Sequence, residues 1–211
     1  MNIGVVLAGG IGARMKASVP KQYMNINGKE VISYSIKTLQ NNKNIDKVIV
    51  VADKTYHTHI KECYMVETCD CGDTRNKTVR NVIDFIIDKQ YKCDKIIFVD
   101  SARPLLNDNM INSGLRHLEK FSAVITCQYI TDSLGFGNEI VDRDNYYLIQ
   151  TPEMFKFDTL INYDKNSNFT AIYQQVDCTV SKNFITDCNL KLTYSSDIYV
   201  LESILKGCDK K

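Results

Sequence analysis

Residues 3–12 read Ile3-Gly4-Val5-Val6-Leu7-Ala8-Gly9-Gly10-Ile11-Gly12, an apolar run that passes directly into glycines. Such a run is typical of a buried parallel strand that ends in a glycine loop. In open α/β sheets, ligands bind beyond the carboxyl ends of the strands. We therefore expect residues 3–7 to form a buried strand and the following glycines to border a ligand site.

Helical and strand patterns alternate after this loop. Three pairs, each with a helical spacing of apolar residues followed by a short apolar run, are 31–40 with 47–52, 78–87 with 95–100, and 109–121 with 123–126. Alternation of this kind predicts an α/β fold with a doubly wound, mostly parallel sheet. We expect residues 1–211 to form a single domain, because this length suits one core and is short for two.

Two later segments depart from the alternation. Between residues 132 and 143, Gly135-Phe136-Gly137-Asn138 lies between short apolar stretches, which predicts a β-hairpin inserted as an arm. Lys191-Leu192-Thr193 is interpreted as the end of a strand, and residues 195–205 as a capped closing helix.

The charge balance argues against nucleic acid or a membrane as a partner. Lys and Arg number 26 against 25 Asp and Glu, a net charge of +1, which gives no broad field to attract polyanions. No apolar stretch approaches about 18 residues, and no basic segment precedes the first apolar run. We expect a cytoplasmic protein.

The eight cysteines are scattered without a C-x-x-C pair, and we expect free thiols. Cys69 and Cys71 with His57 and His59 suggest a zinc site at first sight. Their spacing does not match structural zinc sites, so we interpret them as ordinary exposed or half-buried residues.

The glycine loop is followed by two cations, Arg14 and Lys21. Backbone N–H groups of a glycine loop can close on phosphate oxygens, and the cations can neutralise a triphosphate. A dinucleotide fingerprint requires a third glycine that residues 13–15 lack, and a Walker loop requires a Gly-Lys-Ser/Thr that is also missing. A tight turn with surface cations remains the alternative.

Five separated motifs carry a resemblance over nearly the whole chain. They are the loop itself, Gly72-Asp73-Thr74-Arg75, Asp100-Ser101-Ala102-Arg103-Pro104, Gln150-Thr151-Pro152-Glu153-Met154-Phe155, and Asn189-Leu190-Lys191-Leu192-Thr193. In this order they resemble the cytidylyltransferases that make CDP-alcohols, the family of 2-C-methyl-D-erythritol 4-phosphate cytidylyltransferase and its relatives acting on ribitol 5-phosphate. The resemblance implies a Rossmann-like nucleotidyltransferase fold with an inserted β-arm.

The resemblance also implies a CTP site and its catalytic cations. Arg14 and Lys21 would stabilise charge on the α-phosphate, and Lys191 would reach the triphosphate. The residues implied to line the nucleotide are Leu7, Ala8, Gly9, Gly10, Gly12, Gly72, Asp73, Thr78 and Ser101.

On the acceptor side, the resemblance implies that Asp100 lies near a Mg²⁺ ion and the ribose. Residues implied to bind the phosphorylated alcohol are Asp100, Arg103, Ser133, Arg143 and Thr151. The arm, at about 132–149, would reach the partner subunit's site, which implies a homodimer with composite sites.

Simpler roles stay open for several of these residues. Asp100 could be a helix N-cap, and Arg75 and Arg103 could pair with carboxylates rather than with ligand. On composition alone, Lys191 would be a surface lysine.

The sequence departs from the family pattern mainly on the acceptor side. Val99 stands where many relatives have histidine, and the acid expected after Thr170 is missing. Ser133 replaces a usual threonine, and Leu134 or Gly135 a frequent lysine. The nucleotide half therefore matches more closely than the acceptor half.

We predict transfer of CMP from CTP to a ribitol 5-phosphate-like alcohol, for cell-wall or capsule polymers, with release of pyrophosphate. Leu7-Ala8-Gly9-Gly10 favours this branch, because the isoprenoid branch more often has Ala-Ala-Gly there. The alternatives are 2-C-methyl-D-erythritol 4-phosphate as the acceptor, for isoprenoid synthesis, and a nucleotide-binding regulatory protein without catalysis.

Overall fold

The computed structural model describes residues 1–10, 12, 15, 19–166 and 169–208. The strands are β1 (Asn2–Leu7), β2 (Asn25–Ile26), β3 (Lys29–Glu30), β4 (Lys47–Ala52), β5 (Glu67–Asp70), β6 (Lys95–Asp100), β7 (Ala123–Tyr129), β8 (Gly135–Phe136), β9 (Glu139–Ile140), β10 (Tyr147–Lys156) and β11 (Val180–Phe184). The α-helices are α1 (Val31–Asn41), α2 (His57–Tyr64), α3 (Arg75–Asp88), α4 (Asp108–His117) and α5 (Ser196–Cys208). Short 3₁₀ helices are η2 (Lys21–Tyr23), η3 (Lys54–Tyr56), η4 (Arg143–Asn145), η5 (Phe157–Leu160) and η6 (Ile172–Gln175).

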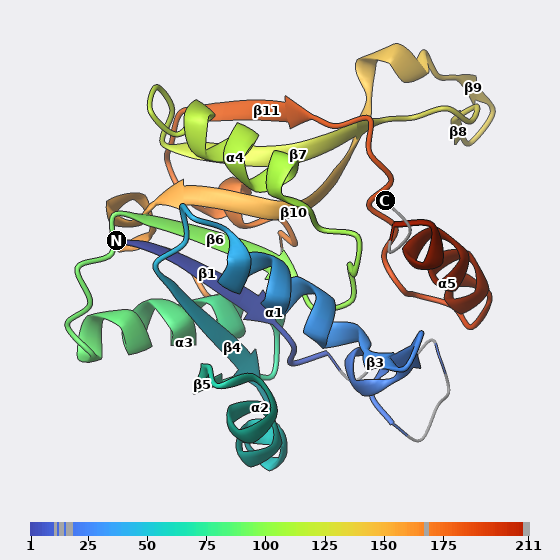
Figure 1. Cartoon of the computed structure of the whole chain (residues 1–211). Coiled ribbons are helices and arrows are strands. Elements are labelled where there is room, and N and C mark those ends of the chain that lie inside the picture. Colours follow the sequence, from blue (N-terminus) through green and yellow to red (C-terminus); the bar gives the residue numbers. More distant parts are fainter. Residues whose placement is uncertain (11, 13–14, 16–18, 167–168, 209–211) are drawn as a thin grey trace.

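Seven strands form the central sheet in the order β11-β7-β10-β6-β1-β4-β5 (Figure 1). β1 pairs in parallel with both β4 and β6, so the predicted buried strand is confirmed near the middle of the sheet. β10 alone runs antiparallel, between β6 and β7. The predicted doubly wound, mostly parallel α/β sheet is confirmed.

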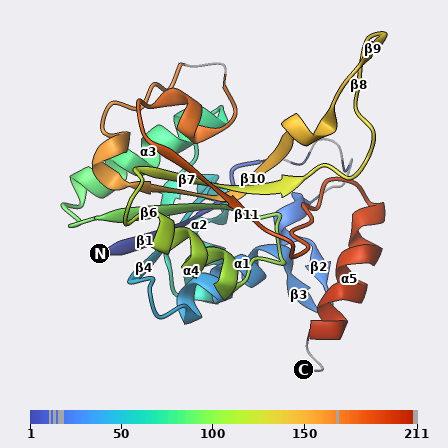
Figure 2. The ribbon, with the colours of Figure 1, turned by 90° about the horizontal axis from the view of Figure 1, so that it is seen from above.

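Helices cover both faces of the sheet, with α1 and α4 on one face and α3 on the other (Figure 2). Each presents an apolar stripe at helical spacing, as Ile32, Ile36 and Leu39 do on α1, and these side chains are fully buried. Full burial of one such side chain contributes about 1.5–3 kcal/mol. Apolar cores therefore cover both faces of the sheet, and the site lies at the carboxyl ends of β1 and β6.

The closing helix α5 is confirmed, and it packs against the small β2–β3 hairpin through Leu201, Leu205 and Ile26. The strand end expected at 191–193 is wrong, because this segment is irregular. The reason is that Asp197 Oδ2 accepts hydrogen bonds from the Thr193 and Tyr194 N–H groups, which takes the Thr193 donor that a strand would use in a ladder.

The predicted arm is confirmed as a hairpin of β8 and β9 that extends away from the sheet beyond β7 and β10 (Figure 1). Gly137 in its turn has φ 58°, a conformation that favours glycine. Phe136 and Ile140 point their apolar side chains into solvent.

The alternation of helical and strand patterns did not predict β5, α2, β10 or β11. β10 in particular has Thr151, cis-Pro152 and Glu153 in its middle, with a register shift at this place. In the part of the chain that the structure describes, no helix combines the length and apolar character needed to cross a membrane. The seven cysteines whose side chains are described are free thiols.

Candidate active site

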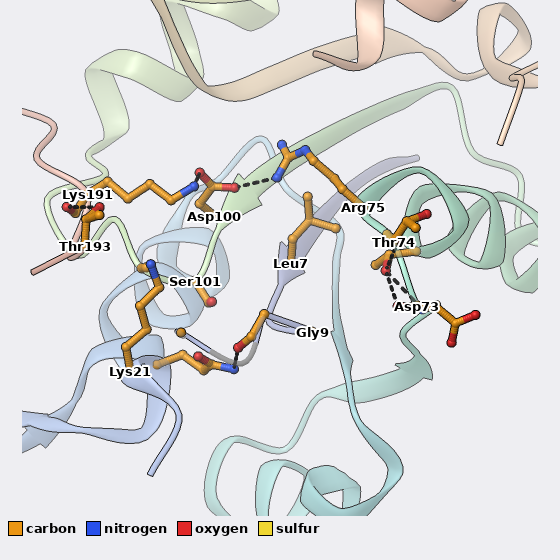
Figure 3. A pocket seen from close by; sticks show the side chains of 16 residues that line it. Leu7, Gly9, Lys21, Asp73, Thr74, Arg75, Asp100, Ser101, Lys191 and Thr193 are labelled. Carbon is orange, nitrogen blue, oxygen red and sulfur yellow. Dashed lines mark hydrogen bonds and ion pairs between the residues drawn. The ribbon is translucent and has the colours of Figure 1, made fainter. Parts of the chain in front are cut away.

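A pocket of about 520 Å³ opens at the carboxyl ends of β1 and β6 and at the loop before α3 (Figure 3). The residues expected from the sequence that line it are Leu7, Gly9, Gly10, Gly12, Lys21, Gly72, Asp73, Thr78, Asp100, Ser101 and Lys191. The structure thus gathers most of the predicted nucleotide site into one cavity. Ala8 lies behind the lining and is buried, and Arg14 lies outside the described residues.

Two glycines of the loop are held by its geometry, Gly9 by a close contact and Gly12 by its backbone conformation. A Cβ added at Gly9 would lie 2.6 Å from the Cys71 Cβ, and Gly12 has φ +68°. Gln22 Nε2 donates to the carbonyl oxygens of Ala8 at 2.7 Å and Gly10 at 2.9 Å. Gln22 therefore fixes the loop from behind, a role that the sequence analysis missed although Gln22 directly follows Lys21.

The opposite wall of the pocket is the turn that leads into α3. Gly72 N–H donates to Thr78 Oγ1 at 3.0 Å, and Thr78 Oγ1 donates to the Thr74 carbonyl at 2.8 Å. A Cβ on Gly72 would lie 2.5 Å from the Lys77 Cβ, so only glycine fits. The Asp73 carboxylate is exposed and pairs with Lys77 at 3.0 Å.

Two lysines from distant segments reach the pocket. Lys21, on η2, donates from Nζ to the Leu192 carbonyl oxygen at 2.7 Å. Lys191 comes from the irregular segment before α5, and its Nζ lies 2.8 Å from Asp100 Oδ2. The Lys21–Leu192 bond therefore ties the glycine-loop side of the pocket to the segment that carries Lys191.

Asp100 ends β6 and lies among three cations. Arg75 Nη1 donates to its Oδ1 at 2.8 Å, while Lys191 Nζ at 2.8 Å and Arg103 Nε at 3.4 Å donate to its Oδ2. Figure 3 shows Arg75 and Lys191 approaching the carboxylate from opposite sides. Burial alone would raise the pKa of Asp100, but the three cations outweigh it and hold the pKa far below its usual range.

These contacts bear on the simpler roles left open for this motif. Asp100 is not a helix N-cap, because the next helix, α4, is capped by Asn107. Arg75 and Arg103 pair with carboxylates, and both also line a cavity beside the site, so this pairing is compatible with contact to a ligand. Lys191 is not an isolated surface lysine, since it is bound to a buried carboxylate.

The residues of this pocket do not form a metal site by themselves. Within the described ranges, no three His, Cys, Asp or Glu residues are grouped to hold an ion. Both oxygens of Asp100 already accept hydrogen bonds from cations, and Asp73 pairs with Lys77. A Mg²⁺ ion bound mainly by triphosphate oxygens, with at most one protein carboxylate, is still compatible with this arrangement.

A second cavity, of about 340 Å³, adjoins the first and shares Arg75, Asp100 and Lys191 with it. Thr151 lies in its lining, and its Oγ1 accepts a hydrogen bond from Asp100 N–H at 3.0 Å. Arg103 Nη1 donates to the Asn189 carbonyl at 2.5 Å. The further residues that line the cavity are Arg103, Ile149, Gln150, Glu153, Thr170, Ala171 and Gln174.

Two predicted acceptor residues lie elsewhere. Ser133 and Arg143 are exposed and belong to the arm segment, and neither lines the two cavities. The Arg143 guanidinium donates to the Thr131 carbonyl and lies 3.9 Å from an Asp144 carboxylate oxygen. Within one subunit, therefore, the structure does not bring these two residues to the site.

Comparisons with known proteins identify the family. The family model described as "IspD: 2-C-methyl-D-erythritol 4-phosphate cytidylyltransferase" matches residues 3–207. The protein of that name from Azobacteroides pseudotrichonymphae is 31% identical over 95% of this chain and 97% of its own length, and that from Clostridium acetobutylicum is 27% identical over 98% of each. Bcs1 of Haemophilus influenzae, a bifunctional ribulose 5-phosphate reductase/CDP-ribitol pyrophosphorylase, is 27% identical over 98% of this chain and 48% of its own.

Solved structures show the same fold. The 4-diphosphocytidyl-2C-methyl-D-erythritol synthase of Anaerococcus prevotii has a TM-score of 0.80 at 20% identity, covering 98% of this chain and 96% of that one. The 2-C-methyl-D-erythritol 4-phosphate cytidylyltransferase of Thermus thermophilus has a TM-score of 0.78 at 16% identity, covering 98% and 100%. Because the family model spans nearly the whole sequence, the chain belongs to the 2-C-methyl-D-erythritol 4-phosphate cytidylyltransferase family.

Proposed function

We propose that the chain is a CTP-dependent cytidylyltransferase, which transfers CMP from CTP to the phosphate of a sugar alcohol and releases pyrophosphate. The observation that carries this proposal is the convergence of Lys21, Asp100 and Lys191 on the cavity that the glycine loop borders. The family match over residues 3–207 supports the same reaction.

Such a reaction depends on positioning and charge rather than on a protein nucleophile. An oxygen of the acceptor phosphate attacks the α-phosphorus of CTP, and the bond from that phosphorus to the oxygen bridging to the β-phosphate breaks. Negative charge grows on the α-phosphoryl group and on the departing pyrophosphate. Lys21 stabilises the first and Lys191 the second, since preorganised cations act most strongly where charge develops.

CTP should be used in preference to ATP and GTP. The turn of Gly72 and Asp73 packs closely against α3, and a wall of this kind leaves little room for the second ring of a purine. We expect kcat/KM for ATP and GTP to be at least about tenfold lower than for CTP. Pyrophosphate release measured with each nucleotide at matched concentrations tests this, and equal turnover with a purine nucleotide would contradict it.

The second cavity is the proposed place of the acceptor, because it adjoins the first and is lined by Arg75, Arg103 and Lys191. Two acceptors have separate support. Leu7-Ala8-Gly9-Gly10 favours a ribitol 5-phosphate-like alcohol, whereas the family model favours 2-C-methyl-D-erythritol 4-phosphate. Measurement of kcat/KM with CTP and a panel of alditol phosphates decides between them, and absence of transfer to any of them would favour a nucleotide-binding regulatory protein.

Magnesium remains part of the proposal as an ion carried by the triphosphate. When bound, it would neutralise phosphate oxygens and so make the leaving pyrophosphate more stable. Asp100, a buried carboxylate in the lining of the first cavity, would be the protein group that holds such an ion. A cytoplasmic location likewise stays a prediction.

A homodimer with composite sites is proposed as the assembly. The arm supports it, because Phe136 and Ile140 are exposed and apolar, and exposed apolar patches mark interaction sites. Arg143, which lies outside the cavities of its own subunit, would then hold the acceptor phosphate of the partner's site. An Arg guanidinium suits this task, since its fork can bind two phosphate oxygens.

Mixing two impaired variants, assayed at an acceptor concentration well below the KM of Arg143→Ala, tests this assembly. Arg143→Ala should raise the KM for the acceptor strongly and leave CTP binding unchanged. In mixed dimers of Arg143→Ala with Lys21→Ala, one site carries both lesions and the other carries neither. Activity should recover to roughly a quarter of wild type if subunits exchange at random, because half of the dimers are mixed and half of their sites are intact. No recovery after confirmed exchange would show that each site is built within one chain.

A further inference from the structure

Glu153 is a buried carboxylate in the wall of the second cavity, and the proposed reaction does not use it. It lies on β10 with only 2% of its surface exposed. Its Oε1 accepts from Arg75 Nη2 at 3.5 Å, and its Oε2 accepts from the backbone N–H groups of Ile172 at 2.8 Å and Tyr173 at 3.4 Å. Burial raises the pKa of Glu153 to about 7, although Arg75 and the two N–H groups favour the ionised form. A carboxyl group that is costly to bury and has these fixed partners calls for a structural reason.

The first partner, Arg75, joins Glu153 to the centre of the site. Its Nη1 donates to Asp100 at 2.8 Å while its Nη2 donates to Glu153. A guanidinium fork that is held at both ends has a fixed orientation. Loss of the Glu153 charge would therefore free one side of the group that contacts Asp100, at the boundary between the two cavities.

The second partner is the start of η6. The residue before this helix, Ala171, makes no side-chain cap, and Glu153 accepts the first N–H groups in its place. Thr170, Ala171 and Gln174, from the same segment, line the second cavity. Glu153 thus holds one wall of the cavity as well as the arginine at its boundary.

We propose that Glu153 is a positioning residue of the acceptor site, which fixes the η6 wall and the Arg75 side chain in the arrangement that receives the alcohol phosphate. The proposal rests on the proposed function for the identity of the occupant. Glu153 does not contact the substrate in this proposal. It acts through Arg75 and through the backbone of η6.

Geometry and electrostatics make opposite predictions for Glu153→Gln. The cavity contains the cations Arg75, Arg103 and Lys191 and the carboxylates Asp100 and Glu153. Because burial raises the pKa of Glu153 to about 7, the substitution removes a negative charge above this pH. The cavity then becomes more positive, and this alone would tighten binding of a phosphate. Positioning predicts the reverse, because a glutamine can keep one N–H partner but turns an NH₂ donor toward either Arg75 or η6.

We expect Glu153→Gln to raise the KM for the acceptor by about tenfold, with the KM for CTP unchanged to within about twofold. The Tm should not fall, because burial raises the pKa of Glu153 to about 7 and the fold therefore disfavours the charged form that the substitution removes. The matched control is Glu67→Gln on β5, which removes a carboxylate paired with Lys47 and Tyr91. This control should leave both KM values unchanged.

An acceptor KM that is unchanged or lower, or an equal rise in both KM values, would overturn the proposal. A second measurement requires no substrate: amide hydrogen exchange at Ile172 and Tyr173 should be faster by about tenfold or more in Glu153→Ala, since the acceptor of both groups is lost. Unchanged exchange would also overturn it. Absence of transfer in the wild type would count against the proposed function alone, because the exchange result still reports on Glu153.

Discussion

We expect Lys21→Met to lower kcat by about a hundredfold or more. The substitution removes a charge that is placed for the transition state, and such a charge contributes about 2.7–4 kcal/mol. The structure gives the reason for choosing methionine. The Lys21 stem packs beside Gly12, whose added Cβ would lie 3.3 Å from the Lys21 Cγ, and methionine keeps most of this stem. The Nζ bond to the Leu192 carbonyl is lost together with the charge.

Binding of CTP should weaken less than kcat falls, because the charge that grows during transfer is absent from the ground state. Lys29→Met, which removes an exposed lysine on β3, is the matched control and should behave as the wild type. Single-turnover kinetics with titrated CTP separate the two quantities. A near-normal kcat in Lys21→Met would mean that this lysine only supports the 191–193 segment. Arg14→Ala is expected to show a similar loss of kcat, although Arg14 lies outside the described residues.

The elements that could be predicted from the sequence are those whose buried residues form a short, continuous pattern of apolar side chains. β1, β4 and β6 are buried on both faces, so each is a continuous apolar run. β10 is equally buried in its second half, yet its buried polar residues Thr151 and Glu153 break the pattern. Their hydrogen-bond partners, Asp100 N–H and Ile172 N–H, are distant in sequence, and no local spacing indicates them.

The same distinction applies to the candidate site. The glycine loop and Asp100 could be expected in one place, because both follow strands whose carboxyl ends meet at one edge of a parallel sheet. The pairing of Arg75 with Asp100 and Glu153 depends on how α3 lies against β6 and β10, which only the folded chain determines. The wrong prediction of a strand end at 191–193 has a related cause. Asp197, which accepts hydrogen bonds from the Thr193 and Tyr194 N–H groups, lies in the following helix, and the local pattern does not indicate this contact.

Asp100→Asn should reduce both activity and stability, because one carboxylate is shared by Arg75, Arg103 and Lys191. An asparagine keeps the shape but removes the carboxylate that the three cations share, while Arg75 keeps its contact with Glu153 at 3.5 Å. Loss of one partner from a buried ion pair costs about 3–5 kcal/mol. The loss here should be nearer the lower end, because the Arg75 and Lys191 side chains are about one-third exposed and water can screen them.

The stability difference between wild type and Asp100→Asn should depend on pH with a definite sign. The folded-state pKa of Asp100 is depressed, so its contribution is complete above the unfolded pKa of about 3.9 and is lost as pH falls below it. In urea unfolding, the free energies of unfolding of wild type and Asp100→Asn should therefore differ by the same amount at pH 7 and pH 5, and by a smaller amount near pH 3.5. Asp84→Asn, which opens the exposed Arg80–Asp84 pair on α3, is the control and should cost less than about 1 kcal/mol. Equal stability losses in the two variants would show that the three cations around Asp100 find other partners, and that the buried carboxylate does not organise the site.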